Sequence, residues 1–339
     1  CFNRTLADRI EAVLRQRGVD ERVQVRTFHS WCADVVNSYQ LQVPPGGDQD
    51  ERFRRLVAVV ERALETGFVP SGQYTALLVD EAHDFEEGWL RMATRLVDRA
   101  TRSLLVLYDD AQSIYQSARR RFRFAAVGIE ARGRTSILKL NYRNTAEVLS
   151  LAVHCARSLL AGAGEARDDD EVPLVQPASA GRRGRLPTLL LARDAQEEAG
   201  LLAERIAEAL AAGTPADEIA VLCRAKFLMR PIEQALQRRG LPVKSMGARE
   251  HRHFDWRRPS IKLLTLHSAK GLEFRLVLVA GLQALPMKAE PLESAARLLY
   301  VAMTRSTHEL VLSAHGRSPI VDRVRASLDD VAREFAVEA

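Results

Sequence analysis

The chain has 339 residues, of which 47% are hydrophobic and 27% are charged, and its formal net charge is +5. This composition is typical of a soluble globular protein with room for two domains, and the absence of any long uncharged apolar run excludes a transmembrane helix. The four cysteines are far apart and form no C-x-x-C pair, which indicates neither a metal site nor a disulfide framework. We therefore expect a reducing, cytoplasmic compartment.

Short runs rich in leucine or β-branched residues alternate with longer stretches of helical period. The runs predicted to be strands are residues 23–26, 76–80, 104–108, 135–140, 188–192, 219–223, 261–267, 276–280 and 309–313. The stretches predicted to be helices are residues 6–16, 51–65, 86–97, 145–160, 195–211 and 293–304. Asn144 is expected to cap the fourth helix, with Glu147 completing a capping box. Alternation of this kind predicts an α/β fold with mainly parallel sheets.

Residues 162–186 interrupt this alternation. They contain an acidic run, two prolines and the basic run Gly181-Arg182-Arg183-Gly184-Arg185. We interpret them as a flexible surface connection rather than as a binding element.

The most informative segment is Leu-Leu-Val-Asp-Glu-Ala-His-Asp at residues 77–84. Ligands of parallel sheets bind at the carboxyl ends of the strands, where this segment delivers Asp80 and Glu81. Asp80 would hold Mg²⁺, through water, because hard cations prefer carboxylate oxygens. Glu81 would orient or deprotonate an attacking water. The alternative is a strand that merely ends in acidic surface residues.

The next predicted strand ends in Asp-Asp-Ala-Gln-Ser-Ile-Tyr at residues 109–115. A neutral amide such as Gln112 can sense a γ-phosphate without adding charge. The alternative is an ordinary polar turn, but the segment follows the first carboxylate strand after only one helix, which favours the phosphate role.

Four further segments have the same character. They are Thr-Phe-His-Ser-Trp at residues 27–31, Leu-Asn-Tyr-Arg-Asn at 140–144, Thr-Leu-His-Ser-Ala-Lys-Gly-Leu-Glu-Phe at 265–274 and Arg-Leu-Leu-Tyr-Val-Ala-Met-Thr-Arg at 297–305. In this order and spacing, and with the Phe-Asn pair at residues 2–3, the segments resemble motifs Ia, Ib, II, III, IV, V and VI of superfamily 1 helicases of the UvrD/Rep/PcrA type.

The resemblance implies two RecA-like domains with the P-loop NTPase fold, at residues 1–140 and 141–339. It implies contacts with single-stranded DNA for Phe2, Asn3, Thr27, His29, Thr265 and His267. It identifies Asp80 as the Mg²⁺ ligand, Glu81 as the catalytic base and Gln112 as the γ-phosphate sensor. It implies that Tyr142 stacks on adenine, that Gly271 and Glu273 contact the nucleotide, and that Arg143 and Arg305 reach the γ-phosphate.

DNA binding also has support from the residue types themselves. The basic residues comprise 43 arginines and six lysines, and arginine forms bidentate contacts to phosphate, although a GC-rich genome would produce the same bias. Stacking on bases needs exposed aromatic rings beside cations, and Phe2, Trp31 and Tyr115 are candidates.

Three departures from the family pattern bear on activity. No G-x-x-x-x-G-K-[ST] loop occurs in the chain, and we expect this loop upstream of Cys1, so that the first domain is truncated and the chain alone hydrolyses ATP barely at all. Motif II ends in His83 where Gln is usual, and motif III has Tyr108 where Gly is usual. The intervals between motifs are also too short for a large accessory subdomain.

The sequence therefore predicts part of an ATP-dependent DNA helicase or translocase, moving 3′ to 5′ by resemblance, with ATP and Mg²⁺ as cofactors and single-stranded or partly duplex DNA as its partner. One alternative is a nucleic-acid-binding scaffold that has lost ATPase activity. Another is the helicase subunit of a DNA-repair nuclease.

Overall fold

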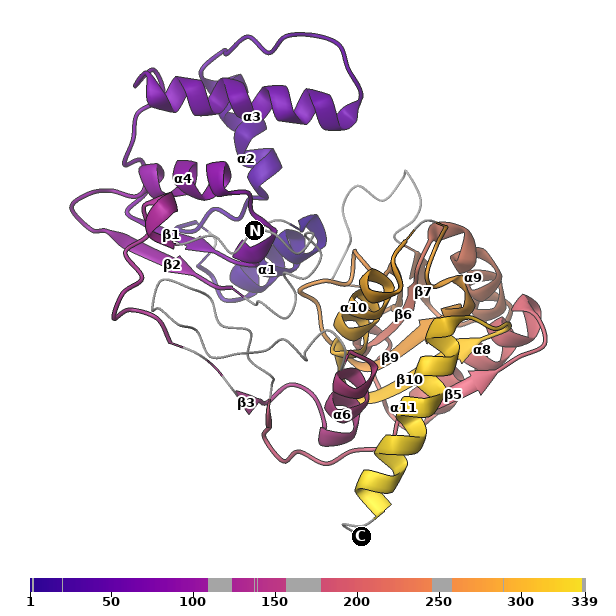
Figure 1. Cartoon of the computed structure of the whole chain (residues 1–339). Helices are drawn as coiled ribbons and strands as arrows, with labels where there is room; N and C mark the ends of the chain where they lie inside the picture. Colours follow the sequence, from indigo (N-terminus) through magenta and orange to yellow (C-terminus); the bar gives the residue numbers. More distant parts are fainter. Residues whose placement is uncertain are drawn as a thin grey trace. The chain divides into compact units, whose positions relative to one another are not determined.

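The computed structural model describes residues 1, 3–19, 21–108, 124–136, 138, 140–156, 178–245, 258–288 and 290–336. They fall into two compact units, each considered by itself: unit 1 contains the described residues up to 136, and unit 2 contains those from 138 onward (Figure 1). The predicted site residues Phe2, Gln112 and Tyr115 lie outside the described residues. Among the described helices, none combines the length and apolar character that a membrane crossing demands.

Unit 1 combines helices with a short parallel sheet. Its elements are α1 (Arg4–Gln16), α2 (Phe28–Ser38), α3 (Gln49–Glu65), β1 (Ala76–Val79), η1 (Ala82–Asp84), α4 (Glu87–Leu96), β2 (Ser103–Val106) and η2 (Phe124–Val127). β1 and β2 pair in parallel, with Leu77 opposite Leu104 and Val79 opposite Val106. Because α4 connects two parallel neighbours, the carboxyl ends of both strands point the same way.

An aromatic cluster forms the centre of the unit 1 core. The ring of Phe28 in α2 stacks on Trp89 in α4 at a centroid distance of 4.5 Å, and Phe85 meets Phe28 edge-on at 5.7 Å. These rings are buried together with aliphatic side chains of α3 and β1. The cluster fixes α4 against the helices that precede β1, and thereby fixes the turn in which the first acidic motif lies.

Unit 2 is built on a parallel sheet of six strands. The described strands of unit 2 are β3 (Leu140–Asn141), β4 (Ala178–Ser179), β5 (Thr188–Leu191), β6 (Ile219–Cys223), β7 (Val243–Ser245), β8 (Ile261–Thr265), β9 (Phe274–Ala280) and β10 (Ser306–Ala314), and the last six form the large sheet. The order in the large sheet is β5-β10-β9-β6-β8-β7, and every pair in it is parallel. β3 and β4 form a separate parallel pair.

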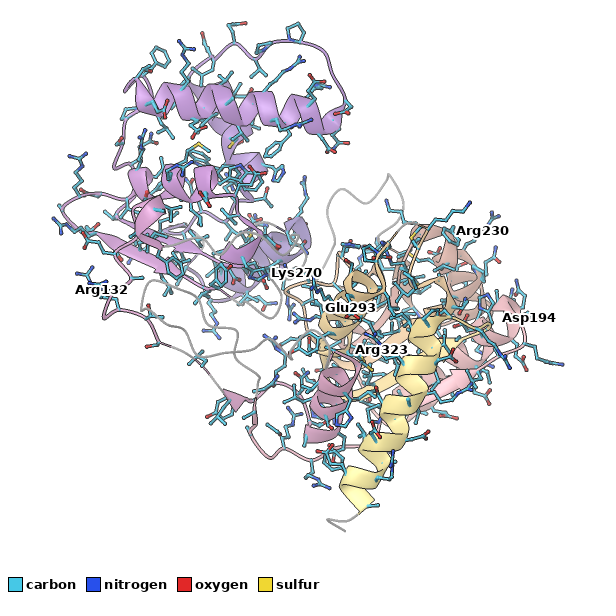
Figure 2. All side chains as sticks on the ribbon, viewed as in Figure 1. Arg132, Asp194, Arg230, Lys270, Glu293 and Arg323 are labelled. Atoms are coloured by element: carbon cyan, nitrogen blue, oxygen red, sulfur yellow. The ribbon has the colours of Figure 1, made fainter. Side chains whose placement is uncertain are left out.

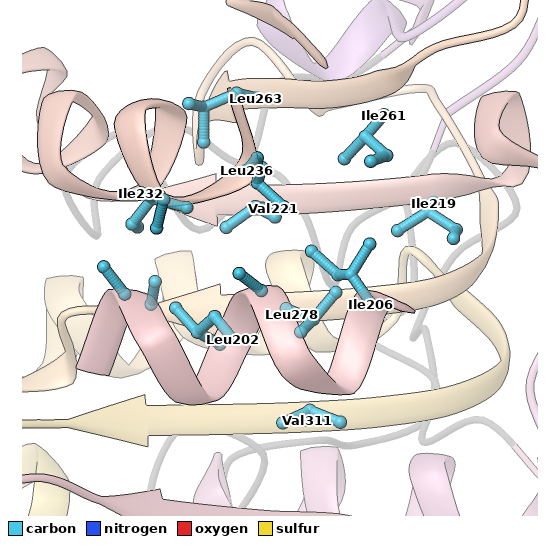
Figure 3. Close-up of a cluster of buried hydrophobic side chains, with 14 of the residues drawn as sticks. Leu202, Ile206, Ile219, Val221, Ile232, Leu236, Ile261, Leu263, Leu278 and Val311 are labelled. Carbon is cyan, nitrogen blue, oxygen red and sulfur yellow. The ribbon is translucent and has the colours of Figure 1, made fainter. Parts of the chain in front are cut away.

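Helices cover both faces of the large sheet. The helices of unit 2 are α6 (Ala146–Cys155), α8 (Ala195–Ala211), α9 (Met229–Arg238), α10 (Leu292–Met303) and α11 (Pro319–Ala336), with one-turn helices η3 (Ala216–Glu218), η4 (Lys226–Leu228) and η5 (Leu282–Ala284). α8 and α9 pack on one face through Leu202, Ile206, Ile232 and Leu236, which meet Val221 and other strand residues (Figure 3). α6 and α10 contact β10 and α11 packs on α6, with Arg323 of α11 3.2 Å from Glu293 of α10 (Figure 2). Burial of both faces explains the continuous apolar run of the central strand β6, whose five residues are all buried.

The fold confirms the predicted α/β class, and the six-stranded parallel sheet is consistent with a RecA-like domain. Residues 23–26, predicted as a strand, are not one: Val23 is exposed, and the carbonyl of Arg26 accepts from the amino group of Cys1 instead of from a strand. Of the strand predicted at residues 135–140, the described residues 135, 136 and 138 are not in a strand, and β3 begins at Leu140. Apolar alternation alone does not supply the partner that a strand requires.

The start of α6 also differs from the prediction. Thr145, not Asn144, caps the helix, and its side-chain oxygen accepts from the amide of Val148. Glu147 is consequently one position too early for a capping box. The amide group of Asn144 donates instead to the carbonyls of Thr304 and Ser306, at 3.0 and 2.6 Å. A bond to residues so distant in sequence overrides the local capping preference.

Candidate functional site

The acidic motif of unit 1 lies at the carboxyl end of β1, as predicted. Asp80 follows the strand directly, and one of its carboxylate oxygens accepts from the amide of Glu81 at 2.9 Å. Partial burial of the Asp80 side chain, together with the negative charge of Glu81, raises the pKa of Asp80. Glu81 adopts a left-handed backbone conformation, with φ 55° and ψ 43°. Such a conformation is strained for a residue with a side chain and is typical of functional turns.

The chain that follows β2 holds this turn in place. The amide of Leu107 donates to the carbonyl of Val79 at 2.8 Å, and the carbonyl of Leu107 accepts from the amide of Ala82 at 3.0 Å. Asp80 and Glu81 therefore lie between two residues, Val79 and Ala82, whose backbones are both hydrogen-bonded to Leu107. The carboxylate of Asp80 fits a Mg²⁺ ligand by its oxygen chemistry and by its place at the end of a parallel strand.

His83 lies next to the carboxylate of Glu81. Its side chain is buried, and its Nε2 atom is 3.1 Å from Oε2 of Glu81. The imidazole also meets the ring of Tyr108 edge-on at 5.7 Å. The two residues by which motifs II and III depart from the family pattern are thus in contact with each other. Glu81, His83 and Asp84 place one possible metal-ligand atom each within 4.8 Å of one another.

The predicted DNA-contact residues of unit 1 have local structural partners. The Thr27 side chain caps α2 by accepting from the amide of Ser30 at 3.1 Å. The His29 ring stacks on Phe53 at 3.7 Å, and partial burial lowers its pKa, which favours the neutral imidazole. Asn3 immediately precedes α1, and its carbonyl accepts from the amide of Ala7. These contacts fix the positions of the three residues within unit 1.

The loop at residues 141–145 of unit 2 presents two predicted nucleotide contacts outward. Tyr142 is 71% exposed, and the Arg143 side chain is also exposed, whereas Asn144 and Thr145 are buried. The side-chain oxygen of Asn141 accepts from the amides of Arg143 and Asn144, both at 2.9 Å, which closes a tight turn. The turn directs the tyrosine ring and the guanidinium away from the core.

The segment between β8 and β9 contains the motif V residues. Nε of Arg143 donates to the Glu273 carboxylate at 2.8 Å, so the predicted phosphate-contact arginine pairs with a predicted nucleotide contact. Gly271 has a φ of 78°, a conformation that favours glycine. Thr265 ends β8, where its hydroxyl oxygen accepts from the amide of Ser268 at 3.2 Å, and His267 is exposed in the turn that follows.

Arg305 is not presented to solvent in this structure. It is 1% exposed, and its guanidinium donates to the carbonyls of Val301 and Leu272, at 2.9 and 3.4 Å. Its own carbonyl accepts from the amide of Phe274 at 2.9 Å. For the expected contact with a γ-phosphate, the side chain would have to leave these carbonyls.

These bonds join the motif IV, V and VI segments within unit 2. Asn144 links motif IV to the turn after α10, Arg143 links motif IV to motif V, and Arg305 links motifs V and VI. The sequence assigned Asn144 only a capping role and residues 162–186 only a flexible connection. In the structure Asn144 bonds to the turn after α10, and residues 178–184 bond to the motif IV loop and α6. The two glycines around Arg182 and Arg183 were the available signal, because glycine permits close backbone approach.

Comparisons with known proteins agree with the motif order. A profile of the UvrD-like helicase C-terminal domain matches residues 137–255 and 245–317, more than half of the chain. Over 232 residues the chain is 30% identical to the ATP-dependent DNA helicase UvrD1 of Mycobacterium tuberculosis (strain ATCC 25618 / H37Rv) and of Mycobacterium bovis (strain ATCC BAA-935 / AF2122/97). This match covers 63% of the chain and 28% of each relative.

Among solved structures, the chain is similar to the C-terminal domain of a possible DNA helicase from Lactobacillus plantarum WCFS1, with 21% identity and a TM-score of 0.40. That similarity covers 56% of this chain and 96% of the other. The chain spans 28% of the length of the curated relatives that it matches. With the family profile covering most of unit 2 and its motifs in order, the chain belongs to the UvrD-like helicase family.

Proposed function

We propose that the protein containing this chain uses ATP hydrolysis to move along single-stranded DNA, in the 3′ to 5′ direction, and to separate duplex DNA. The observation that supports this most is the hydrogen-bonded assembly of motifs IV, V and VI in unit 2. A scaffold without ATPase activity would have no need for two arginines and a glutamate gathered around a nucleotide-contact loop.

In this proposal the side chains of unit 1 act on the water and the metal. Asp80 holds Mg²⁺ through water, and Mg²⁺ neutralises charge on the phosphates when bound. Glu81 orients the attacking water and accepts its proton. Gln112 senses the γ-phosphate.

The side chains of unit 2 act on the nucleotide. Tyr142 stacks on the adenine, and Gly271 and Glu273 contact the nucleotide. Arg143 and Arg305 stabilise the negative charge that develops on the γ-phosphate oxygens. The exposed position of the Tyr142 ring supports the stacking role.

The DNA track in this proposal comprises Phe2, Asn3, Thr27, His29 and Tyr115 in the first domain and Thr265 and His267 in the second. Affinity for single-stranded DNA should then fall as salt is added, because phosphate contacts release counterions. Binding measured by fluorescence anisotropy over a range of salt concentrations would contradict the phosphate contacts if the affinity did not change.

The catalytic assignment is tested in the full-length protein with Glu81→Gln. We expect DNA-stimulated phosphate release to fall by about 10²–10⁴-fold, since general base catalysis contributes that much. Glu86→Gln is the matched control, because Glu86 precedes α4 and its side chain makes no capping hydrogen bond. Equal rates for Glu81→Gln and the wild type would remove Glu81 from its role. DNA binding without any ATP turnover in the wild type would favour a scaffold instead.

A further inference from the structure

Residues 178–185, here called the clasp, run alongside the loop at residues 141–145. β4 of the clasp pairs in parallel with β3, which places Ala178 opposite Leu140 and Ser179 opposite Asn141. The pairing continues beyond the strands, where the amide of Ala180 donates to the carbonyl of Asn141 at 3.2 Å. This part of the expected flexible connection is therefore bonded to the start of motif IV.

Arg182 bonds to the middle of the turn that carries the predicted nucleotide contacts and to the first residue of α6 after it. Its NH1 donates to the carbonyl of Arg143 at 3.2 Å, and its own carbonyl accepts from the amide of Ala146 at 2.7 Å. Its NH2 lies 2.5 Å from Nε2 and 2.9 Å from Nδ1 of the His308 ring. Partial burial of the His308 ring, with the positive charges of Arg182 and Arg275, lowers its pKa and keeps the ring neutral, able to accept from Arg182. One guanidinium thus connects motif IV to β10.

The end of the clasp is bonded to α6. Glu147 is 3% exposed, and one of its carboxylate oxygens accepts from the amide of Gly184 at 2.8 Å. Its other oxygen lies 3.0 Å from Nε of Arg183. A Cβ atom at position 184 would lie 2.5 Å from Cγ2 of Thr145, so this approach requires glycine. Two independent contacts therefore hold the clasp against the cap of α6.

We propose that the clasp is part of the nucleotide site and that Arg182 is a positioning residue for Tyr142 and Arg143. This inference rests on the proposed function. The Tyr142 ring is 71% exposed, and the exposed Arg143 side chain donates to Glu273, so the backbone of the loop sets the direction in which both side chains leave it. Asn144 holds that backbone from the core, and Arg182 holds it from the side of the clasp. Affinity for a ligand is higher when its contacts are already oriented.

The test is Arg182→Ala in the full-length protein, with KM for ATP, kcat and the melting temperature measured together. We expect KM for ATP to rise about tenfold, the order of effect of one lost hydrogen bond to a charged group, while kcat changes less. Arg182→Lys should recover part of the affinity, because an ammonium reaches one of the two acceptors. Arg185→Ala is the matched control: Arg185 lies in the same clasp, but its side chain is 76% exposed and its nearest carboxylate oxygen is 3.8 Å away.

A positioning role also predicts a second result, which a merely structural role would not produce. In a Tyr142→Ala background, Arg182→Ala should raise KM for ATP by less than in the wild type, because one of the two contacts that it positions is already absent. A KM for Arg182→Ala equal to that of Arg185→Ala would overturn the inference. If Arg182→Ala does not fold, Arg182→Lys is compared with Arg185→Lys by the same criterion.

Failure of the proposed function is separable from failure of this inference. If Glu81→Gln and Tyr142→Ala leave ATP turnover unchanged, the proposed function fails. If both reduce turnover or affinity as expected and Arg182→Ala behaves like its control, only the role of the clasp fails.

Discussion

At the scale of single residues, the contact between His83 and Glu81 restricts the orientation of the Glu81 carboxylate, which the sequence of the motif does not reveal. His83 is buried, and its Nε2 atom is 3.1 Å from the carboxylate of the proposed catalytic base. Its ring rests edge-on against Tyr108. A buried neighbour of this kind restricts the directions that the Glu81 carboxylate can take, and catalysis depends strongly on such orientation.

We therefore expect His83→Leu to lower kcat for ATP hydrolysis about tenfold in the full-length protein, with little change in KM, because Glu81 loses a polar neighbour that orients it. His83→Gln, which keeps an N–H donor, should recover part of the rate. Steady-state phosphate release measures both. His154→Gln is the control, since His154 is a partly buried histidine of α6 that also lies near carboxylates. An equal loss for His83→Leu in a Glu81→Gln background would show that His83 acts independently of Glu81.

The position of Asp80 and Glu81 was predictable because it depends on local sequence, an apolar strand followed directly by two carboxylates. The partners of Asn144 were not predictable in this way. They lie 160 and 162 residues further along the chain, and no local pattern reports them. For the same reason the buried setting of Arg305 could not be read from its motif.

At the scale of elements, the best predictions concern segments whose burial is continuous. The boundaries of β6 and α8 were predicted to the residue, because an apolar run of five residues and a long amphipathic helix have few alternatives. The predicted strand at residues 23–26 alternates valine with polar residues, yet Val23 is exposed. Its pattern predicted a strand, but strand pairing depends on a neighbour that the pattern cannot specify.

Two glycines of unit 2 should respond oppositely to substitution by alanine. Gly200 lies within α8, and a Cβ there would have no heavy atom within 4 Å, so Gly200→Ala should stabilise the protein by roughly 0.5–1 kcal/mol. Gly184→Ala should destabilise it by roughly 1–3 kcal/mol, because the new methyl group collides with Thr145. Chemical denaturation of unit 2 measures both changes. Two shifts of the same sign would contradict the packing described around Gly184.

At the scale of the whole molecule, each compact unit has a hydrophobic core of its own. Parts of a protein unfold together when they share a hydrophobic core. Two separate cores therefore predict two separate unfolding transitions. The large sheet of unit 2, with buried strands covered by helices on both faces, should be the more stable of the two. Its apolar side chains are closely packed around Leu202 and Ile206 (Figure 3).

Calorimetry should therefore resolve two unfolding transitions. Ile206→Ala removes a fully buried side chain of unit 2 and should cost about 2–5 kcal/mol in that unit, lowering one transition and leaving the other in place. Val60→Ala, at a fully buried position of unit 1, should lower the other transition by a smaller amount. A single transition that both variants shift equally would mean that the units unfold together.

The hydrogen bonds from Asn144 to the carbonyls of Thr304 and Ser306 also constrain the order of folding. Contacts that join distant residues form late, because the intervening chain must first be ordered. During synthesis the loop at residues 141–145 leaves the ribosome long before Ser306 is made, so it cannot take its final shape until β10 joins the sheet. The loop at residues 141–145, which is proposed to contact the nucleotide, is thus among the last parts of unit 2 to become native.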